Sequence, residues 1–232
     1  MHKTYTKAKT LMRIRKDGDN TLLDKSAIIL AGGFSKRFGQ DKGLVQLAGK
    51  PLIKHVLDKV GNIVDEKVVV VSSKVQGENF AKVAGLNVNV VMDVGDVRSP
   101  LLGALTGFQE AHGEYALLLP CDSPFISRDV LLLLFELCMG KSAVIPRWPN
   151  GFIEPLHAVY CTKLALEAAK NALKEGKLNM QSMVDALRGV RYVSTLVLQQ
   201  LDPELRTFMN VNTPLDLKKA ERIIKRKEKA KS

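Results

Sequence analysis

Two glycines directly after an apolar segment, followed by two cations, are the residues of this 232-residue chain best suited to chemistry. The segment 27–30 is apolar, Gly32 and Gly33 come next, and Arg37 and Lys42 follow within ten residues. Glycines let the backbone turn sharply and bring its N–H groups close to a ligand, because no Cβ stands in the way. The stretch therefore predicts a phosphate-binding loop. An ordinary tight turn is the alternative, but such a turn would need neither cation.

The loop differs from the common phosphate-binding motifs. Walker A requires G-x-x-x-x-G-K-[ST], whereas five residues separate Gly33 from Gly39 and Lys42 is followed by Gly43. The dinucleotide-binding pattern G-x-G-x-x-G is absent as well. The loop therefore has to be interpreted from its own residues.

A carboxylate follows a second apolar segment. The stretch 115–119 is typical of a buried strand, Asp122 comes shortly after it, and Pro124 stiffens the exit. Mg²⁺ prefers one or two carboxylates and completes its shell with water and phosphate oxygens, so Asp122 is a candidate magnesium ligand. The alternative is that Asp122 caps a helix beginning near Ser127 or starts a turn. A phosphate loop, two cations and a metal carboxylate together predict phosphoryl or nucleotidyl transfer, which requires alignment and charge compensation.

Apolar segments alternate with segments of helical periodicity along most of the chain, which is typical of a parallel sheet with right-handed crossovers. Ligands bind such sheets beyond the carboxyl ends of the strands, so the glycine loop and Asp122 should meet at one edge. We expect strands at 26–30, 67–71, 87–92, 115–119, 143–145 and 156–160. We expect helices at 51–60, 100–111, 129–139 and 163–174, and a last helix from 215 toward 231.

The formal charge of +11 is concentrated at the two ends of the chain. Residues 1–25 hold seven Lys/Arg and three acids, and residues 218–232 hold eight and two, so the ends supply +4 and +6 and about +1 remains. We interpret 1–25 as a basic N-terminal extension, 26–217 as one α/β nucleotidyltransferase domain and 218–232 as a basic helix or tail. A nearly neutral body is not a groove for nucleic acid, so we expect no nucleic-acid partner.

Cysteine, histidine and hydropathy patterns exclude several other classes. Cys121, Cys138 and Cys161 are far apart and form no C-x-x-C, which is typical of a reducing compartment. The four histidines form no H-E-x-x-H zinc motif. No apolar secretory core follows the basic N-terminus, and the longest apolar run, 130–135, is too short to span a bilayer. We therefore expect a cytoplasmic protein without a membrane partner.

The chain resembles a known family, the molybdenum cofactor guanylyltransferases, within the GT-A-like nucleotidyltransferases. The family's opening motif L-A-G-G-x-S-x-R-x-G-x-D-K is reproduced without a gap from Leu30 to Lys42. Similar motifs follow in order: G-K-P-L-I at 49–53, S-P-L-L-G at 99–103, C-D-S-P at 121–124 and N-V-N-T-P at 210–214. The resemblance covers residues 26 to about 218. It implies a single-domain, three-layer α/β/α fold with a mostly parallel, Rossmann-like sheet.

The resemblance also implies roles for individual residues. Asp122 would bind both GTP and the cofactor Mg²⁺, Arg37 and Lys42 would neutralise the triphosphate, and Asn210 and Asn212 would line the site near the acceptor, molybdopterin. The implied reaction transfers GMP from GTP to the terminal phosphate of molybdopterin and releases pyrophosphate. Molybdoenzymes or cofactor-biosynthesis proteins would be partner proteins. The residues implied to bind GTP are Leu30, Ala31, Gly32, Gly33, Lys42, Asp93 and Asp122.

Several alternatives stay open. The second glycine of the loop favours GTP, but Ser99 replaces a family glycine and Ser73 replaces a nucleotide-contacting Asn of some members. A cytidylyltransferase for the same pterin, a guanylyltransferase for cobinamide phosphate or phospholactate, and a non-catalytic nucleotide-binding module are the rival functions. Asn210 and Asn212 have the alternative of capping the helix that begins at Thr-Pro. His157 is either an acceptor contact or a structural histidine.

Overall fold

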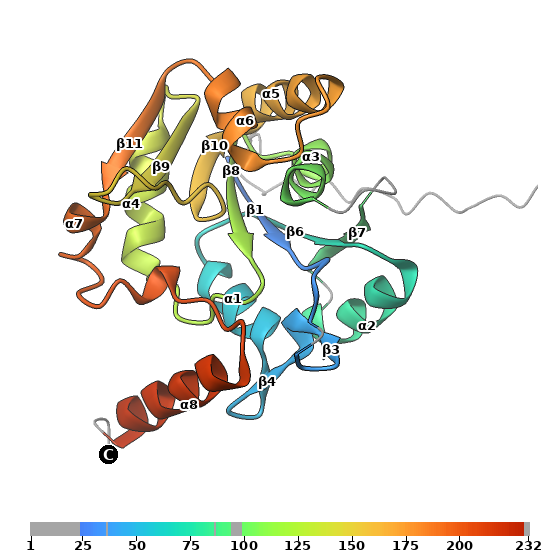
Figure 1. Ribbon diagram of the computed structural model, residues 1–232, viewed down its shortest axis with the longest axis vertical. Coiled ribbons are helices and arrows are strands. Elements are labelled where there is room, and N and C mark those ends of the chain that lie inside the picture. The colour runs from blue at the N-terminus through green and yellow to red at the C-terminus, as the bar shows by residue number, and fades with distance from the viewer. Residues whose placement is uncertain (1–23, 36, 86, 94–98, 230–232) are drawn as a thin grey trace, which may run out of the picture.

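A seven-stranded sheet with helices on both faces forms the centre of the molecule (Figure 1). The computed structural model describes residues 24–35, 37–85, 87–93 and 99–229, so the expected extension up to residue 23 and residues 230–232 lie outside the described residues. The strands of the sheet are β1 (Lys25–Leu30), β6 (Glu66–Val71), β7 (Asn89–Met92), β8 (Tyr115–Pro120), β9 (Ala143–Arg147), β10 (Ala158–Cys161) and β11 (Val190–Ser194). Their order across the sheet is β11-β9-β10-β8-β1-β6-β7.

The central strands form because their residues are apolar on both sides. In β1, Ala27 and Ile29 lie in one hydrophobic cluster and Ile28 lies in the other, as the period of two in a strand requires. The same alternation runs through β6 and β8, which both pair with β1 in parallel. Strands buried on both faces are typical of parallel sheets covered by helices. The strands predicted at 26–30, 67–71 and 115–119 are therefore confirmed, each extended by one residue.

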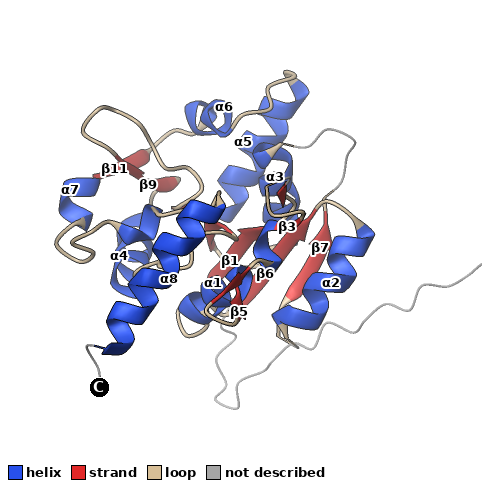
Figure 2. Cartoon of the chain, turned by 60° about the horizontal axis from the view of Figure 1, so that its bottom comes forward, coloured by secondary structure: helices blue, strands red, loops and turns tan. Residues whose placement is uncertain are grey.

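The helices divide into two layers, one on each face of the sheet. Figure 2 shows β1, β6 and β7 running in order between α3 and α1. The single-domain, three-layer α/β/α arrangement with a mostly parallel sheet is thus confirmed. The helices that contribute to the first cluster are α1 (Leu52–Val60), α2 (Lys74–Ala84), α4 (Arg128–Cys138) and α7 (Thr195–Leu198). Those that contribute to the second are α3 (Pro100–Glu110), α5 (Thr162–Lys174) and α6 (Met180–Ala186).

One strand of the sheet runs against the others. β10 pairs antiparallel with both β8 and β9, whereas β9 and β11 are parallel. The reason is the connection: no helix lies between β9 and β10, so the chain has no crossover and returns in the opposite direction. The strand predicted at 156–160 is shifted to Ala158–Cys161, because residues 154–157 form the turn that precedes it.

Several elements were not predicted from the sequence. Helix α2 was missed, and so were α6, β11 and α7 in the region after α5. The strand predicted at 87–92 begins only at Asn89, as β7. The predicted helices at 51–60, 100–111, 129–139 and 163–174 are confirmed as α1, α3, α4 and α5, with ends that differ by one residue.

Two short hairpins and a C-terminal helix complete the chain. The hairpins are β2 (Phe34–Ser35) with β3 (Gln40–Asp41), and β4 (Gln46–Leu47) with β5 (Lys50–Pro51). The short 3₁₀ helices η1 (Lys42–Leu44) and η2 (Arg206–Phe208) lie in connections. Helix α8 (Pro214–Lys229) extends away from the body at its C-terminal end (Figure 1).

The start of α8 packs on a small third cluster. Ala220 is fully buried there with Leu47, Leu52 and Val211. The boundary expected between 217 and 218 therefore falls inside one continuous helix that is anchored to the body. Among the residues that the structure describes, none of the helices combines the length and the apolar character that a membrane span requires.

Candidate active site

The loop after β1 is held open and close to its neighbouring strand. Ala31 is buried and its N–H donates to the Val70 carbonyl at 2.8 Å, which continues the ladder past the end of β1. The Ser72 hydroxyl donates to the Gly32 carbonyl at 2.8 Å. A Cβ on Gly32 would collide with this hydroxyl, so glycine is required at this position for steric reasons. Apart from its chain neighbours, no heavy atom of the described residues lies within 4 Å of a Cβ built on Gly33, so this glycine lies beside open space in that part of the structure.

Lys42 returns to the same loop through the β2–β3 hairpin. Its backbone N–H donates to the Gly33 carbonyl at 3.2 Å, and Gly39 adopts a positive φ of 64° that closes the turn. The hairpin is also tied to α2, because the side-chain amide of Gln76 donates to Asp41 Oδ1 at 2.6 Å. Gln76 in turn accepts from the Ser72 N–H at 2.8 Å. A buried glutamine therefore fixes both the loop that contacts Gly32 and the residue before Lys42.

Asp122 is brought to this loop by β8. The Cys121 N–H donates to the Leu30 carbonyl at 3.1 Å, so the ends of β1 and β8 stay side by side. The Asp122 side chain is 6% exposed and forms an ion pair with the ammonium of Lys42. Helix α4 begins after Ser127 rather than at Asp122, so the alternative that Asp122 caps this helix is wrong. The structure thus brings Lys42 and Asp122 together at the predicted edge of the sheet.

The segment before α8 closes the site. The Val211 N–H donates to the Asp122 carbonyl at 2.9 Å, and Asn212 Oδ1 accepts from the Lys42 ammonium. Asn210 Oδ1 accepts from the Ser123 hydroxyl at 2.6 Å. Both asparagines therefore face the Asp122 loop.

Neither asparagine caps α8. Thr213 has that role, because its hydroxyl accepts from the Asp216 N–H at 3.1 Å. The Asp216 carboxylate accepts in return from the Thr213 N–H at 2.9 Å, which completes a capping box. Hydrogen bonding to the Thr213 hydroxyl lowers the pKa of Asp216, as a carboxylate that accepts several hydrogen bonds requires. The alternative that Asn210 or Asn212 is a helix cap is wrong.

Asp93 follows β7, which is two strands from β1 along the same edge of the sheet. Its N–H donates to the Val71 carbonyl at 2.7 Å, and its Oδ1 accepts from the Thr106 hydroxyl at 2.9 Å. A Cβ on Gly103 would lie 3.7 Å from Asp93 Oδ2 and 3.4 Å from the Leu30 side chain, so the start of α3 packs between them. Asp93 is therefore next to the glycine loop, in the layer of α3.

Ser99 and Ser73 both act as helix caps. The Ser99 hydroxyl accepts from the Leu102 N–H at 3.1 Å at the start of α3, and Ser73 accepts from the Gln76 N–H at 3.2 Å at the start of α2. The two departures from the family pattern thus have a local structural use in this chain.

Arg37 is the predicted site residue that the structure does not bring to the others. It lies in the β2–β3 hairpin, its side chain is exposed, and it forms no ion pair with any described residue. An exposed arginine in a hairpin beside the loop is free to move toward a bound polyphosphate.

The donor set around the Lys42 ammonium suits a cation. The Asp122 carboxylate and the Asn212 amide oxygen both contact this ammonium. The described part of the chain contains no cluster of three or more His, Cys, Asp or Glu that would enclose a metal. Mg²⁺ commonly takes one or two carboxylates and obtains its other ligands from water and phosphate, so these residues fit Mg²⁺ bound together with a nucleotide.

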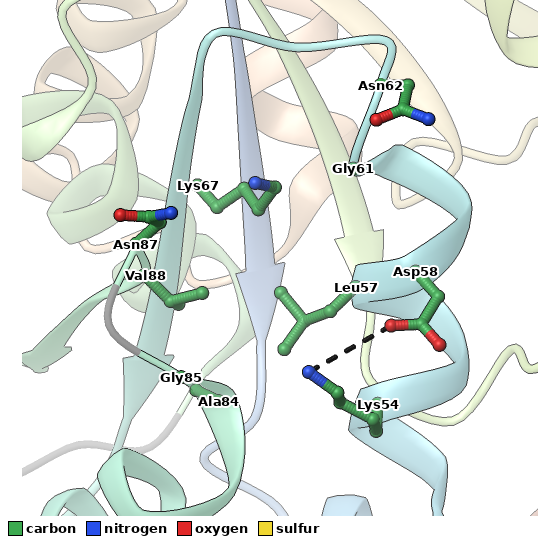
Figure 3. Close-up of a pocket in the computed structure, with 10 residues that line it drawn as sticks. All are labelled: Lys54, Leu57, Asp58, Gly61, Asn62, Lys67, Ala84, Gly85, Asn87 and Val88. Atoms are coloured by element: carbon green, nitrogen blue, oxygen red, sulfur yellow. Dashed lines mark ion pairs between the residues drawn. The ribbon is translucent and has the colours of Figure 1, made fainter.

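A separate hollow lies at the opposite edge of the sheet. Its volume is about 400 Å³, and its lining includes Gly61 and Gly85, which follow the C-terminal ends of α1 and α2 (Figure 3). Lys67, near the start of β6, and Lys54, which pairs with Asp58 at 4.0 Å, also line it. The hollow shares no residue with the candidate active site.

The sequence motifs and this geometry agree with known proteins. Residues 27–190 match the family described as MobA-like NTP transferase domain. The probable molybdenum cofactor guanylyltransferase of Methanosarcina mazei is 34% identical over 198 residues, which cover 83% of this chain and 88% of the relative. The molybdenum cofactor guanylyltransferase of Desulfosudis oleivorans is 34% identical over 202 residues, covering 86% of this chain and 96% of the relative.

A solved structure supports the same assignment. The crystal structure of molybdopterin-guanine dinucleotide biosynthesis protein A from Archaeoglobus fulgidus superposes with a TM-score of 0.73 at 28% identity. The similarity covers 87% of this chain and 99% of that protein. The family and the fold expected from the motifs are thereby confirmed. The chain belongs to the family of MobA-like NTP transferases and is a nucleotidyltransferase.

Proposed function

We propose that the chain transfers GMP from GTP to the terminal phosphate of molybdopterin and releases pyrophosphate. The observation that supports this most strongly is the convergence of Lys42, Asp122 and Asn212 beside the Gly32 loop. Such a site offers cations, a carboxylate and close backbone approach, which are the means by which proteins align and stabilise phosphoryl groups. The relatives named as molybdenum cofactor guanylyltransferases support the choice of donor and acceptor.

The residues of the loop would hold the donor nucleotide. Backbone N–H groups of Gly32 and Gly33 would bind phosphate oxygens, because neither residue has a side chain to keep a ligand away. Leu30 and Ala31 would contact the nucleotide from the end of β1, since the Ala31 N–H is already bonded to the Val70 carbonyl. Lys42 leaves its pairing with Asp122 to neutralise the triphosphate, and Arg37 approaches from the exposed hairpin. Asp93, beside the loop and fixed by Thr106, accepts hydrogen bonds from the guanine nucleotide.

Asp122, with Asn212 next to it, would hold Mg²⁺. The bound ion supplies positive charge to the triphosphate and to the leaving pyrophosphate. The protein's own contribution is to hold the carboxylate next to the glycine loop, where Lys42 contacts it. The Val211 N–H donates to the Asp122 carbonyl at 2.9 Å, which holds the main chain of Asp122 beside the segment before α8. Asn210 and Asn212 would line the acceptor side of the site, next to the Asp122 loop.

A pyrophosphate assay tests this function. The full chain is incubated with Mg²⁺, with GTP or CTP, and with molybdopterin, cobinamide phosphate or phospholactate. Rapid pyrophosphate release is expected only with GTP and molybdopterin. Release with CTP, or with another acceptor in place of molybdopterin, would replace the proposal by one of the alternative transferases, and GTP binding without release would indicate a nucleotide-binding module.

The Asp122→Asn variant tests the metal role in the same assay. It should lose turnover while its unfolding transition stays cooperative, because the amide is isosteric but carries no charge. Asp129→Asn is the matched control, since Asp129 is an exposed carboxylate at the start of α4 and should leave turnover unchanged. Turnover retained in Asp122→Asn would refute the metal role.

The cytoplasm is the compartment in which we propose that the reaction takes place. Three unpaired cysteines, two of them buried, favour a reducing compartment, and the cytoplasm supplies GTP and Mg²⁺. The basic ends are proposed to serve partner proteins of cofactor biosynthesis or acceptor molybdoenzymes rather than nucleic acid.

A further inference from the structure

A chain of polar side chains runs behind the candidate active site, from the β9–β10 connection to Asn210. The Trp148 indole N–H donates to Glu154 Oε1 at 2.7 Å. Glu154 Oε2 lies 3.7 Å from His157 Nδ1, and His157 Nε2 lies 3.0 Å from the Ser123 hydroxyl. Ser123 in turn lies 2.6 Å from Asn210 Oδ1. Three segments that are distant in the sequence are thus connected next to Asp122.

The middle of this row of polar side chains, Ser123 and His157, is buried away from solvent. Ser123 is 0% exposed and His157 is 2% exposed. The Phe208 ring covers the outer side, edge to face with His157 at 5.4 Å and with Trp148 at 5.6 Å between ring centroids. Burial acts to raise the pKa of Glu154, but its interaction with His157 and the hydrogen bond from Trp148 outweigh burial and lower it. Glu154 is therefore held as a carboxylate at the end of the chain.

Counting protons fixes the direction of the hydrogen bonds. A serine hydroxyl has one hydrogen, and Asn210 Oδ1 can only accept, so the Ser123 hydrogen is used in the bond to Asn210. The Ser123 oxygen must then accept from His157, which requires a proton on His157 Nε2. The other ring nitrogen, Nδ1, faces Glu154 and has no hydrogen-bond partner among the described residues.

The order Glu–His–Ser resembles the triads of enzymes with a serine nucleophile, but the proton direction is the reverse. In such triads the serine donates to the histidine, which removes its proton during attack. Here Ser123 accepts from His157, and its hydroxyl is buried away from any substrate. Ser123 and His157 are therefore suited to positioning another residue and not to covalent catalysis.

The residue that they position is Asn210. With Oδ1 committed to the Ser123 hydrogen, the amide NH₂ group is the end of Asn210 that remains to serve a ligand. The next residue, Val211, is bonded to the Asp122 carbonyl, and Asn212 contacts Lys42, so Asn210 is held within the same short segment. A phosphate group presents only acceptor oxygens to a protein, so an amide NH₂ is complementary to it.

We propose that His157 and Ser123 are positioning residues that orient Asn210 so that its NH₂ group donates to the phosphate of the acceptor. This inference rests on the proposed function for the identity of the acceptor, but the proton arrangement does not depend on it. A reversed Asn210 would place a carbonyl oxygen against the acceptor phosphate. The Asn210 oxygen and the phosphate oxygens would then repel each other. The orientation that His157 and Ser123 impose on Asn210 therefore favours an acceptor that carries a phosphate.

The proton arrangement can be measured on the wild-type chain without any substrate. The protein has four histidines, so ¹⁵N-histidine labelling gives few signals in a long-range ¹H–¹⁵N spectrum. His157→Gln removes one set of signals and assigns it. We expect His157 with a protonated Nε2 whose proton exchanges slowly with solvent, because the ring is buried. A neutral ring protonated only at Nδ1 would overturn the proposal, since Ser123 would then donate to His157.

Steady-state kinetics test whether the positioning of Asn210 affects the acceptor and not the donor nucleotide. Ser123→Ala should raise the KM for molybdopterin by about 10- to 100-fold, the effect of one hydrogen bond to a charged group, with the KM for GTP within about twofold. Ser142→Ala is the matched control, because Ser142 is also buried but its hydroxyl has no partner among the described residues. It should leave both constants unchanged.

The outcomes distinguish this inference from the proposed function. If the wild type transfers no GMP to molybdopterin, the function fails while the histidine spectrum still reports on the proton arrangement. Suppose instead that the wild type is active. The positioning role then fails if Ser123→Ala raises the KM values for GTP and for the acceptor equally, and it also fails if the variant raises neither value. Loss of the unfolding transition in Ser123→Ala leaves the spectrum of the wild type as the deciding measurement.

Discussion

Ser72 fills the space that a side chain on Gly32 would need. Its hydroxyl donates to the Gly32 carbonyl at 2.8 Å, and a Cβ on Gly32 would collide with this oxygen and approach the Ser72 Cβ to 3.2 Å. The two residues follow neighbouring parallel strands, β1 and β6, so the contact joins the two loops at the carboxyl edge of the sheet. The close approach explains why the first glycine of the pair cannot be replaced without moving the neighbouring loop.

Gly32→Ala should therefore lower the free energy of unfolding by about 1–3 kcal/mol, the usual cost of overpacking a tight site. The hydroxyl of Ser72 must rotate away and lose its bond to the Gly32 carbonyl, and the backbone must still shift. Urea denaturation measures the change. Nucleotide affinity should fall as well, because the loop that offers its N–H groups is displaced.

Gly33→Ala is the matched control for stability. Beyond its chain neighbours, a Cβ on Gly33 meets no described residue within 4 Å, so the change should alter the free energy of unfolding by less than about 0.5 kcal/mol. If nucleotide binding is nevertheless lost in Gly33→Ala, the open space beside this glycine is where the ligand lies. Equal destabilisation by the two substitutions would contradict the role given to Ser72.

The ion pair between Lys42 and Asp122 should couple the two residues energetically. Lys42→Met leaves a buried carboxylate without its cation, which should cost on the order of 2 kcal/mol of stability. Adding Asp122→Asn to this variant removes the unpaired charge, so the double variant should recover part of the loss. A double-mutant cycle from urea denaturation gives the coupling. Strictly additive effects would show that the pair does not stabilise the ligand-free protein.

Much of this site could be predicted from the sequence because parallel strands bring their carboxyl ends together. Apolar runs identified β1 and β8, and from these it followed that the glycine loop and Asp122 would be neighbours. The ion pair of Asp122 with Lys42 confirms that expectation. The position of Arg37 could not be predicted from the parallel strands. Arg37 lies in the two-stranded β2–β3 hairpin, which leaves its side chain exposed.

The remaining elements depend on contacts that no local pattern shows. Helix α2 has Gly77 in its interior and few buried apolar residues, so its periodicity is weak, and its stability comes from Phe80 and from the cap at Ser73. The pairing of Ser123 with His157 requires β10 to run antiparallel to β8 in one register, with Ala158 opposite Leu118. Such pairing between distant segments is set by the whole sheet.

The three cysteines should differ sharply in reactivity. Burial raises the pKa of Cys138 to about 12 and raises the pKa of Cys121 further, so neither forms appreciable thiolate at pH 8. Cys161 is only partly buried. Iodoacetamide at pH 8 should therefore modify Cys161 first, as peptide mass spectrometry will show. Labelling of Cys138 or Cys121 should begin only above a pH at which thiolate forms, or after unfolding.

Cys161→Ser is the control for this experiment. It should abolish the fast labelling of the native protein while all remaining cysteines react in urea. Rapid modification of Cys121 in the native protein would mean that the Asp122 loop opens, because the Cys121 thiol is 4% exposed and packs next to Gly43.

Two glycines inside helices should respond to alanine in opposite directions. Alanine normally stabilises a helix interior by up to about 1 kcal/mol relative to glycine. At Gly77, in α2, a Cβ would lie 3.7 Å from the Val71 side chain, an ordinary contact, so Gly77→Ala should raise the midpoint of thermal unfolding. At Gly107, in α3, a Cβ would collide with the Ile28 side chain in the middle of β1, so Gly107→Ala should lower the midpoint.

The loss of stability expected for Gly107→Ala follows from the packing of α3 on the sheet. Ile28 is fully buried in the same cluster as Leu101 and Phe108, so it cannot move without disturbing its neighbours. We expect Gly107→Ala to cost about 1–3 kcal/mol despite the gain in helix propensity. Ile28→Ala removes the Cγ2 methyl with which the new Cβ would collide, so the double variant should lose less stability than the sum of the two single variants. If Gly107→Ala were as stable as Gly77→Ala, α3 would have to lie further from β1 than the structure places it.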